Sequence, residues 1–257
     1  MFDYLKTKIL FMPVLASQHG KDVDDFIVYV HLLMAILFVG WMGYFCYTLF
    51  RFRQTRHPKA DPVGVTSHAS TYIELAVAAI EAVLLIGFAV PLWAKVVDKF
   101  PDRKDATVIR LTAEQFAWSA RYPGADGEFG TQDPKAFAAD NPLAYVKDDA
   151  KGKDDVTAPL GEVHVPAEKP VIIYLTSKDV IHSFKVAPLR VTQDAIPGMV
   201  SVLHFVPTLP GKYMITCAQL CGSGHSTMKG LFTVDTKENF VKWMAVKSKS
   251  GGATSFE

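Results

Sequence analysis

The chain has 257 residues, a formal net charge of +1 and 49% hydrophobic residues. This near-neutral balance gives no support for nucleic-acid binding, and three cysteines do not make a disulfide framework. The length allows one domain of ordinary size together with membrane anchors.

The first 25 residues precede a long apolar run. Lys6, Lys8 and the apolar residues 9–16 resemble a signal sequence, but the apolar stretch is short and Pro13 interrupts it. We therefore expect residues 1–25 to form an extramembrane segment, interfacial or amphipathic, that stays in the mature chain. The sequence leaves its cleavage open.

Two apolar segments follow, at residues 26–50 and 72–94. The first contains no Asp, Glu, Lys or Arg. About 20 apolar residues cross a bilayer as a helix, so we predict two transmembrane helices within residues 26–94. The loop that begins at Arg51 is short and basic, which favours the cytoplasmic side, although the contrast is modest because basic residues also follow the second segment. Cys46 lies in the first segment, where it is most simply a small hydrophobe.

The second segment carries two glutamates, Glu74 and Glu81, seven residues apart. Seven residues are close to two helical turns, so both carboxyl groups lie on one face. Carboxylates in a membrane helix usually face a helix bundle or a water-filled path. The chain therefore implies partner helices that it does not contain, although Glu74 lies near enough to one end to meet water instead.

Residues 95–247 are expected to form a water-soluble all-β domain, with residues 125–160 as an inserted loop. Short strands are predicted at 108–111, 115–122, 163–165, 171–176, 181–186, 200–206, 212–217 and 229–234. Many short strands with regular turns predict an antiparallel sandwich or barrel. A closing helix is expected at 238–246 and a disordered tail at 248–257.

The most informative stretch is Cys217-x3-Cys221-x3-His225-x2-Met228. Thiolate and thioether are soft ligands and imidazole suits copper, so the set favours copper over hard cations. A blue-copper site has one thiolate, whereas two thiolates here suggest two copper ions bridged by both sulfurs. That site needs a further imidazole, for which His182 is the best candidate.

Simpler readings compete with copper at this stretch. Cys217 and Cys221 could form a disulfide in an oxidising compartment. They could also bind zinc with His225, although a thioether is not a usual zinc ligand. Met228 could be core filler.

Three motifs together resemble subunit II of a haem–copper respiratory oxidase: Asp-Val-Ile-His-Ser-Phe at 179–184, Gln-Asp-Ala-Ile-Pro-Gly at 193–198, and the cysteine motif at 217–228. The resemblance covers residues 22–245. It implies a two-helix transmembrane hairpin followed by a cupredoxin-like Greek-key sandwich. The domain and both termini would lie on the periplasmic side of a bacterial inner membrane.

The resemblance also implies a function. A binuclear copper centre, CuA, would accept electrons from cytochrome c and pass them to haem a in subunit I. Oxygen reduction, coupled to proton translocation, would take place in that subunit, and the haem would lie only there. Subunits I and III would be partners, so the chain would belong to an enzyme complex without being its catalytic subunit.

By resemblance, Cys217 and Cys221 bridge the two copper ions, and each of the two histidines binds one ion. Met228 and the backbone carbonyl of Gln219 are the weak ligands. Gln219 stands where relatives often have a glutamate that also helps to bind magnesium at the contact with subunit I. An amide is a weaker ligand for a hard cation, so magnesium is in doubt here.

Four further residues take roles from the resemblance. Asp194 is expected to support a histidine ligand by a hydrogen bond, or else to cap the turn at Pro197-Gly198. Phe116 and Trp118 match the tryptophans of a Gln-Trp-Tyr-Trp motif, the first of which is the electron-entry surface for soluble cytochrome c. Phe116 there is typical of oxidases fed by a tethered cytochrome c domain, such as one of alternative complex III. Glu74 matches a glutamate at a proton pathway into subunit I.

Other functions remain open on the sequence alone. The CuA subunit of a nitric oxide reductase would show the same helices and loop. Nitrous oxide reductase shares the loop but is soluble and larger. A membrane-tethered copper carrier would bind one labile ion, and a quinol oxidase subunit would lack the copper ligands. Glu81 stands where many relatives have proline and receives no role from the resemblance.

Overall fold

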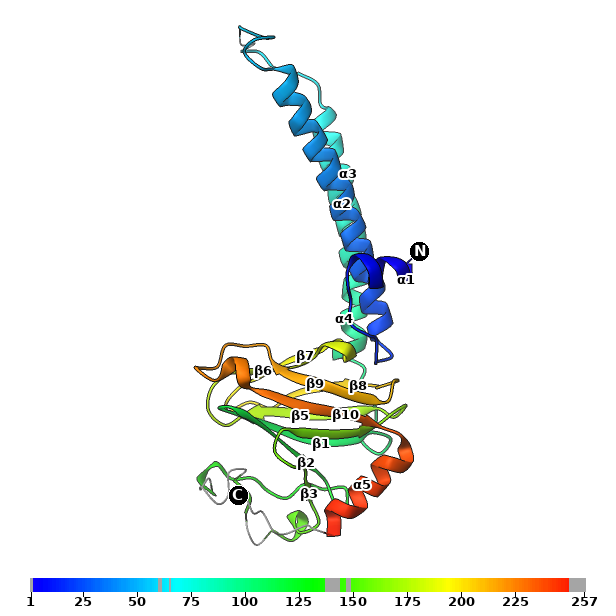
Figure 1. Ribbon diagram of the computed structural model, residues 1–257, viewed down its shortest axis with the longest axis vertical. Coiled ribbons are helices and arrows are strands. Elements are labelled where there is room, and N and C mark those ends of the chain that lie inside the picture. The colour runs from blue at the N-terminus through cyan, green and yellow to red at the C-terminus, as the bar shows by residue number, and fades with distance from the viewer. Residues whose placement is uncertain (1, 60–61, 65, 137–143, 147–148, 250–257) are drawn as a thin grey trace. The chain divides into compact units, whose positions relative to one another are not determined.

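The computed structural model describes residues 2–59, 62–64, 66–136, 144–146 and 149–249. It divides into two compact units (Figure 1). One unit comprises Met1–Met12 and Asp22–Lys95, and the other comprises Pro13–Lys21 and Val96–Glu257. The first unit is helical and the second is built mainly of strands.

Two helical segments, Gly20–Arg51 and Ala69–Val97, are long and apolar enough to cross a membrane. They contain the predicted segments 26–50 and 72–94, so the expectation of two apolar helices is confirmed. Both helices extend beyond the predicted apolar segments into polar residues, because charged side chains are compatible with helical structure. The helical elements are α1 (Phe2–Tyr4), η1 (Leu5–Ile9), α2 (Gly20–Arg51), α3 (Ala69–Leu84), η2 (Leu85–Ala89) and α4 (Val90–Val97).

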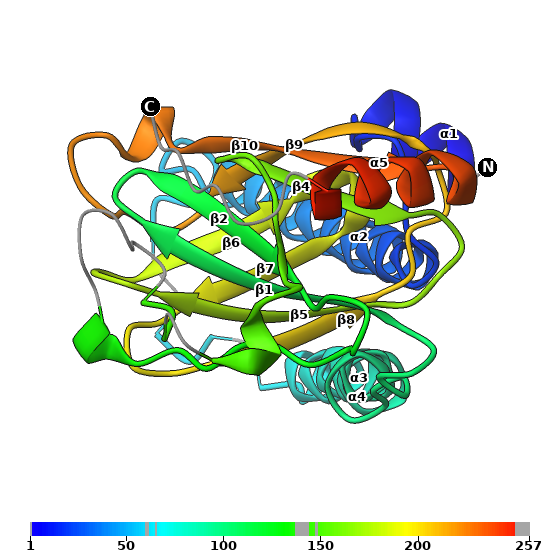
Figure 2. The same cartoon turned by 90° about the horizontal axis from the view of Figure 1, so that it is seen from below.

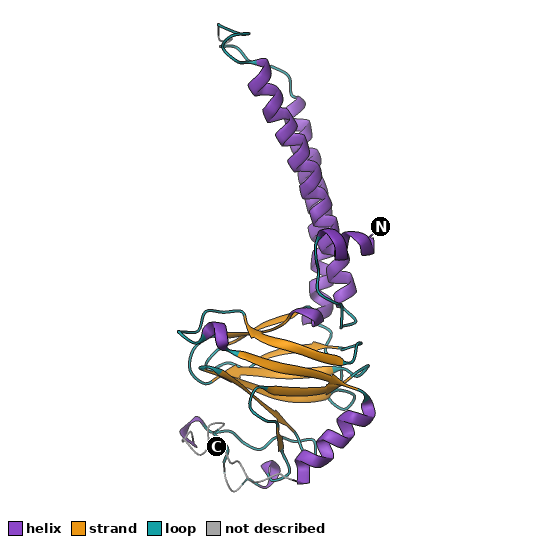
Figure 3. Cartoon of the chain, viewed as in Figure 1, coloured by secondary structure: helices purple, strands orange, loops and turns teal. Residues whose placement is uncertain are grey.

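The β domain consists of two five-stranded sheets packed face to face, ordered β3-β2-β1-β5-β8 and β4-β10-β9-β6-β7 (Figures 1 and 3). The first sheet contains β1 (Thr107–Glu114), β2 (Ala117–Tyr122), β3 (Val156–Thr157), β5 (Val171–Ser177) and β8 (Ser201–Phe205). The second contains β4 (Glu162–Pro166), β6 (His182–Val186), β7 (Val191–Ala195), β9 (Gly211–Cys217) and β10 (Lys229–Asp235).

The pairing differs from the antiparallel expectation in one respect. Each sheet contains one parallel pair, β1 with β5 and β4 with β10. These partners are not consecutive in the chain, so a long connection lets them run in the same direction. Strands β3 and β7 were not predicted from the sequence, because β3 has only two residues and β7 is polar in its middle.

One hydrophobic core fills the space between the sheets. Its largest fully buried side chains include Trp118, Tyr122, Phe184 and Phe232. The predicted closing helix is present as α5 (Lys237–Lys249), which lies alongside β4 and β10 (Figure 2). Trp243 of this helix packs edge-on against Tyr122, with ring centroids 5.3 Å apart.

Residues 13–21, the N-terminal strap, belong to the β domain. Ala16 is fully buried in its core, and its backbone N–H donates to Pro188 while its carbonyl accepts from Thr208. The Ser17 hydroxyl donates to the Leu189 carbonyl at 2.6 Å. The expected separate segment 1–25 is therefore divided between the two units, and its last residues open α2. The β domain begins with the strap and not at residue 95.

Part of the predicted insert 125–160 lies outside the described residues, as does most of the predicted tail 248–257. The described part holds short helical turns at Pro134–Ala136 and Ala150–Gly152. The insert packs on the first sheet through a buried ion pair between Arg121 and Asp155. It is thus anchored to the domain at its end, where β3 forms.

Candidate metal centre

Adjacent strands of the second sheet bring the candidate ligands together. His182 opens β6, and Cys217 closes the neighbouring strand β9, where it lies opposite Phe184. The chain then loops back, and the Ala218 N–H donates to the Ser183 carbonyl. The loop continues into a 3-10 turn at His225–Thr227 before β10 begins.

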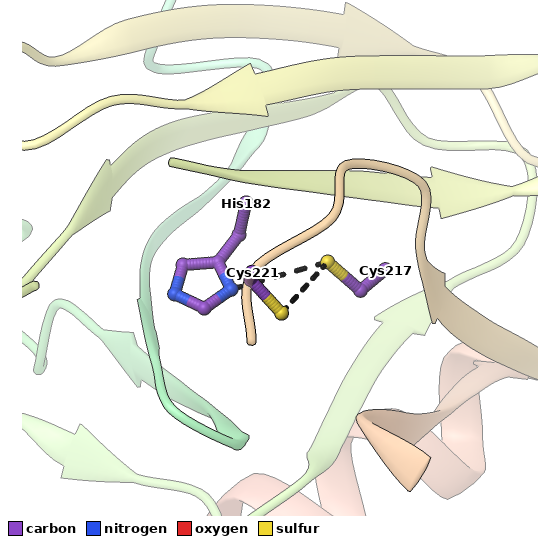
Figure 4. A group of neighbouring side chains, drawn as sticks. All are labelled: His182, Cys217 and Cys221. Carbon is purple, nitrogen blue, oxygen red and sulfur yellow. Dashed lines mark hydrogen bonds between the residues drawn. The ribbon is translucent and has the colours of Figure 1, made fainter. Parts of the chain in front are cut away.

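Within this loop the sulfur and nitrogen atoms converge. The Cys217 and Cys221 sulfurs are 3.8 Å apart, and the His182 Nδ1 lies 3.9 Å from the Cys217 sulfur. Figure 4 shows these three side chains pointing toward one another. On the other side of Cys221, the His225 Nδ1 lies at 3.5 Å and the Met228 sulfur at 3.8 Å.

A backbone oxygen completes the donor set. The carbonyl of Gln219 lies 3.1 Å from the Cys217 sulfur, while the residue that follows, Leu220, is largely exposed. The structure therefore brings together all six predicted donors, although they are spread over residues 182–228. Both cysteines are free thiols. The metal interpretation requires free thiols, whereas the disulfide alternative requires a bond between the two sulfurs.

The spacing of these atoms fits a soft metal ion. Around an ion bonded to sulfur at about 2.3 Å, ligand atoms at tetrahedral angles stand roughly 3.7 Å apart. The observed separations of 3.5–3.9 Å between neighbouring donors match that value. A set of two thiols, two imidazoles and a thioether binds copper in preference to hard cations.

The site is partly shielded from water. His182, Met228 and Cys221 are buried, whereas Cys217 and His225 are half-buried. Burial, followed by the neighbouring Cys217 thiol, raises the pKa of Cys221 to about 11. A bound cation replaces the proton of such a thiol, so a metal ion satisfies a sulfur that water cannot reach.

A carboxylate that the sequence did not single out orients His182. The Asp179 Oδ1 lies 2.9 Å from the His182 Nε2. That carboxylate is itself held by the backbone N–H groups of Val180 and Gln115, both at 2.7 Å. Burial acts to raise the pKa of Asp179, but the hydrogen bonds from His182 and the backbone outweigh it and lower the pKa. The imidazole therefore presents Nδ1 to the sulfurs.

Asp194 was expected in that role and does not fill it. It is exposed on β7, opposite Ser183, and within the described residues the imidazole of His182 bonds to Asp179 instead. A signal for Asp179 was present in the sequence, because it precedes the histidine by three residues in the same motif. That spacing lets a short loop turn the carboxylate back onto the ring.

The turn between β1 and β2 covers the metal loop. The Gln115 side-chain amide donates to the Cys221 carbonyl, and the Phe116 ring lies against the loop's glycines. A Cβ on Gly224 would stand 2.4 Å from the Phe116 Cδ2, so only glycine allows this approach. Trp118 is fully buried with its ring edge-on to His182, whereas Phe116 is 36% exposed. Of the two, Phe116 alone can meet a partner protein.

The remaining predicted residues lie elsewhere. Glu74 and Glu81 are exposed on α3, in the helical unit. Among the histidines that had no assignment, His164 bonds through Nδ1 to Asp235 at 2.7 Å. It stacks on Trp243 of α5 and so helps to hold that helix.

Comparison with known proteins places this geometry in a family context. Residues 107–234 match the family described as cytochrome c oxidase subunit II, periplasmic domain. An alternative cytochrome c oxidase subunit 2 from Bradyrhizobium diazoefficiens is 29% identical over 231 residues, 90% of this chain and 82% of the relative. Cytochrome c oxidase subunit 2 from Synechocystis sp. is 30% identical over 258 residues, 92% of this chain and 76% of the relative.

A solved structure shows a weaker likeness. The periplasmic domain of subunit II of cytochrome oxidase from Bradyrhizobium japonicum is 25% identical, with a TM-score of 0.44. The match covers 60% of this chain and all of that domain.

Proposed function

Because this chain belongs to the cytochrome c oxidase subunit II family, we propose that its buried donor cluster holds the binuclear copper centre CuA. The centre takes electrons from a cytochrome c and passes them to haem a of subunit I. The observation that carries this proposal is the convergence of two thiols, two imidazoles, a thioether and one backbone carbonyl in a single region. The β domain would then be a cupredoxin-like Greek-key sandwich.

Each donor has a role in this proposal. Cys217 and Cys221 would both hold the copper pair, and His182 and His225 would each bind one ion. Met228 and the backbone carbonyl of Gln219 are weak ligands. When bound, the copper pair supplies an electron carrier in which one electron is shared between two ions.

The protein holds the ligands of that centre in fixed positions. Two paired strands fix His182 and Cys217, the glycine-rich loop positions the other donors, and Asp179 sets the orientation of the imidazole. A site whose ligands cannot move reorganises little when its charge changes, which favours fast electron transfer. The side chain of Gln219 offers an amide where a carboxylate would bind magnesium, so we expect magnesium at the subunit I contact to be weak or absent.

Phe116 is the proposed point of electron entry. It is partly exposed, covers the loop that carries the ligands, and lies in the same short turn as the Gln115 amide that holds that loop. Trp118, the second residue of the pair, lies in the core with its ring edge-on to His182. We propose that the donor is a membrane-bound or tethered cytochrome c domain, such as one of alternative complex III. Fast turnover of the purified oxidase with soluble cytochrome c, unchanged by Phe116→Ala, would argue against both points.

The two apolar helices would span a bacterial inner membrane, with both termini and the copper domain on the periplasmic side. Subunits I and III would pack against them. Glu74, exposed on α3, would lie at the entrance of a proton path into subunit I. In the assembled oxidase, Glu74→Gln is expected to slow oxygen consumption without slowing copper reduction by the donor.

The proposed function is tested by removing one bridging sulfur. Cys217→Ser in the assembled oxidase is expected to lose copper from this subunit and to abolish rapid oxidation of the donor in stopped-flow. Cys46→Ser is the matched control, because Cys46 is exposed on α2 and outside the cluster. Full copper content and normal donor oxidation in Cys217→Ser would refute the assignment.

A further inference from the structure

Glu81 is a carboxyl group in the middle of an apolar helix. It lies twelve residues after the first residue of the helical segment Ala69–Val97, about 18 Å along the axis at 1.5 Å per residue. From residue 75 to residue 94 it is the only charged side chain. Its side chain is exposed on the helix, and within the described residues no polar group of this chain contacts it.

Glu81 shares a helix face with Glu74. Seven residues correspond to nearly two full turns, so the two carboxyl groups differ by about 20° around the axis and by about 10 Å along it. Both side chains are exposed. One partner facing this side of α3 would meet both carboxyl groups.

The helix changes its hydrogen-bonding pattern about one turn after Glu81. The Leu85 N–H is shared between the carbonyls of Glu81 and Ala82, and the π-helical turn η2 (Leu85–Ala89) follows. Single π turns inside α-helices are rare and frequently mark functional sites. Here the wider turn sits next to the one carboxyl group in the apolar stretch.

This inference rests on the proposed function, which places the helix in a membrane beside a partner subunit. If Ala69–Val97 spans the membrane, an anionic carboxylate at this depth is costly in contact with lipid. Ionisable groups in such positions face a bundle interior or a water-filled path. Of the two partner subunits, subunit I is the one in which oxygen reduction would consume protons, so we assign this face of α3 to the contact with subunit I.

We propose that Glu81 is a second proton-binding group on the path that Glu74 opens, about two helical turns further into the membrane. The Glu81 carboxylate accepts a proton from water that is continuous with Glu74 and the inner aqueous phase. It releases that proton to a water molecule or hydroxyl group of subunit I and returns to the carboxylate. No electron is exchanged in this step.

The test uses the assembled oxidase with Glu81→Gln, which keeps the size and polarity of the side chain but cannot carry the proton. Steady-state oxygen consumption is expected to fall by about tenfold or more and its pH profile to change. Glu81→Asp, which retains the carboxyl group, is expected to recover most of the rate. Ile80→Ala, at the neighbouring position, is the control for a change in packing alone and should behave as wild type.

Two results with the variants would overturn the proposal. One is a Gln variant with wild-type turnover and pH profile. The other is equal loss in the Gln and Asp variants with an unchanged pH profile, which would mean a packing role. If the Gln variant does not assemble, the wild-type complex is treated with dicyclohexylcarbodiimide, which modifies protonated carboxyl groups in apolar surroundings. Modified Glu81 is expected by mass spectrometry, and an unmodified Glu81 would overturn the proposal.

Stopped-flow reduction of copper by the donor, measured on the same preparations, separates this proposal from the proposed function. Glu81→Gln should leave that rate unchanged. Absence of copper reduction in the wild-type complex would defeat the proposed function itself, whatever Glu81 does.

Discussion

At the scale of residues, the orientation of the His182 ring depends on the different partners of its two nitrogens. Nδ1 faces the Cys217 sulfur, while Nε2 bonds to Asp179. Partners of this kind fix the ring orientation and tautomer of a metal ligand, and their loss typically lowers metal affinity by about 10–100-fold.

Asp179→Asn should therefore weaken copper retention by about 10–100-fold, measured by competition with a copper chelator. Asp194→Asn is the matched control, since Asp194 is an exposed aspartate on β7 that does not bond to the ring. Equal copper retention in the two variants would contradict the role given to Asp179.

The ligand residues themselves were predictable, because their chemistry is unusual and most of them lie in one short stretch. Their supporting residues were less so. Asp179 and Asp194 both flank His182 in sequence, and only the fold shows that the loop before β6 turns one of them onto the ring. Likewise, alternation in the predicted strand 115–122 puts Phe116 and Trp118 on one face and does not reveal that Trp118 is entirely buried while Phe116, in the turn before β2, reaches the surface.

Among the structural elements, the metal loop and the β1–β2 turn act together through close contact. The Phe116 ring occupies the space where a Cβ of Gly224 would lie, 2.4 Å from the Phe116 Cδ2. The glycine is thus required by the packing of an aromatic ring on the loop backbone.

Gly224→Ala should displace the Phe116 ring and slow electron transfer from the donor, while the copper ligands stay in the chain. Stopped-flow donor oxidation is the measurement, with copper content determined alongside. Ser223→Ala is the control, because Ser223 is exposed in the same loop. Unchanged donor oxidation in Gly224→Ala would mean that Phe116 does not carry the entry of electrons.

The N-terminal strap is a second element whose role follows from burial. Ala16→Asp would place a charge in the core of the β domain, which typically destabilises a protein by roughly 3 kcal/mol or more. The unfolding midpoint of the full chain should fall clearly. Val14→Asp makes the same change at an exposed strap residue and should have little effect. Similar midpoints for the two variants would show that the strap is not part of the domain.

Local patterns predicted most elements but not all of their connections. Alternation and turn signals located eight of the strands, and the lengths of the apolar segments located both apolar helices. The parallel pairs β1–β5 and β4–β10 join strands distant in sequence, which no local pattern records. The strap has no hydrophobic periodicity that marks it as an edge segment, and its short apolar run resembled a signal sequence instead.

At the scale of the whole molecule, the two units have different roles in an electron-entry subunit. One unit provides two apolar helices and the exposed carboxyl groups Glu74 and Glu81, and the other provides a rigid sandwich around the donor cluster. Because the strap belongs to the sandwich, a soluble fragment that begins at residue 95 lacks part of its own core. Measurements on the metal centre are therefore best made on the full chain.

The most direct measurement is the copper content and electron paramagnetic resonance spectrum of the purified full-length chain after loading with copper under reducing conditions and partial oxidation. Two copper ions per chain, a purple colour and a multi-line hyperfine pattern from one electron shared over both nuclei are predicted. A single copper ion, bound zinc, or a Cys217–Cys221 disulfide that persists under these conditions would contradict the account.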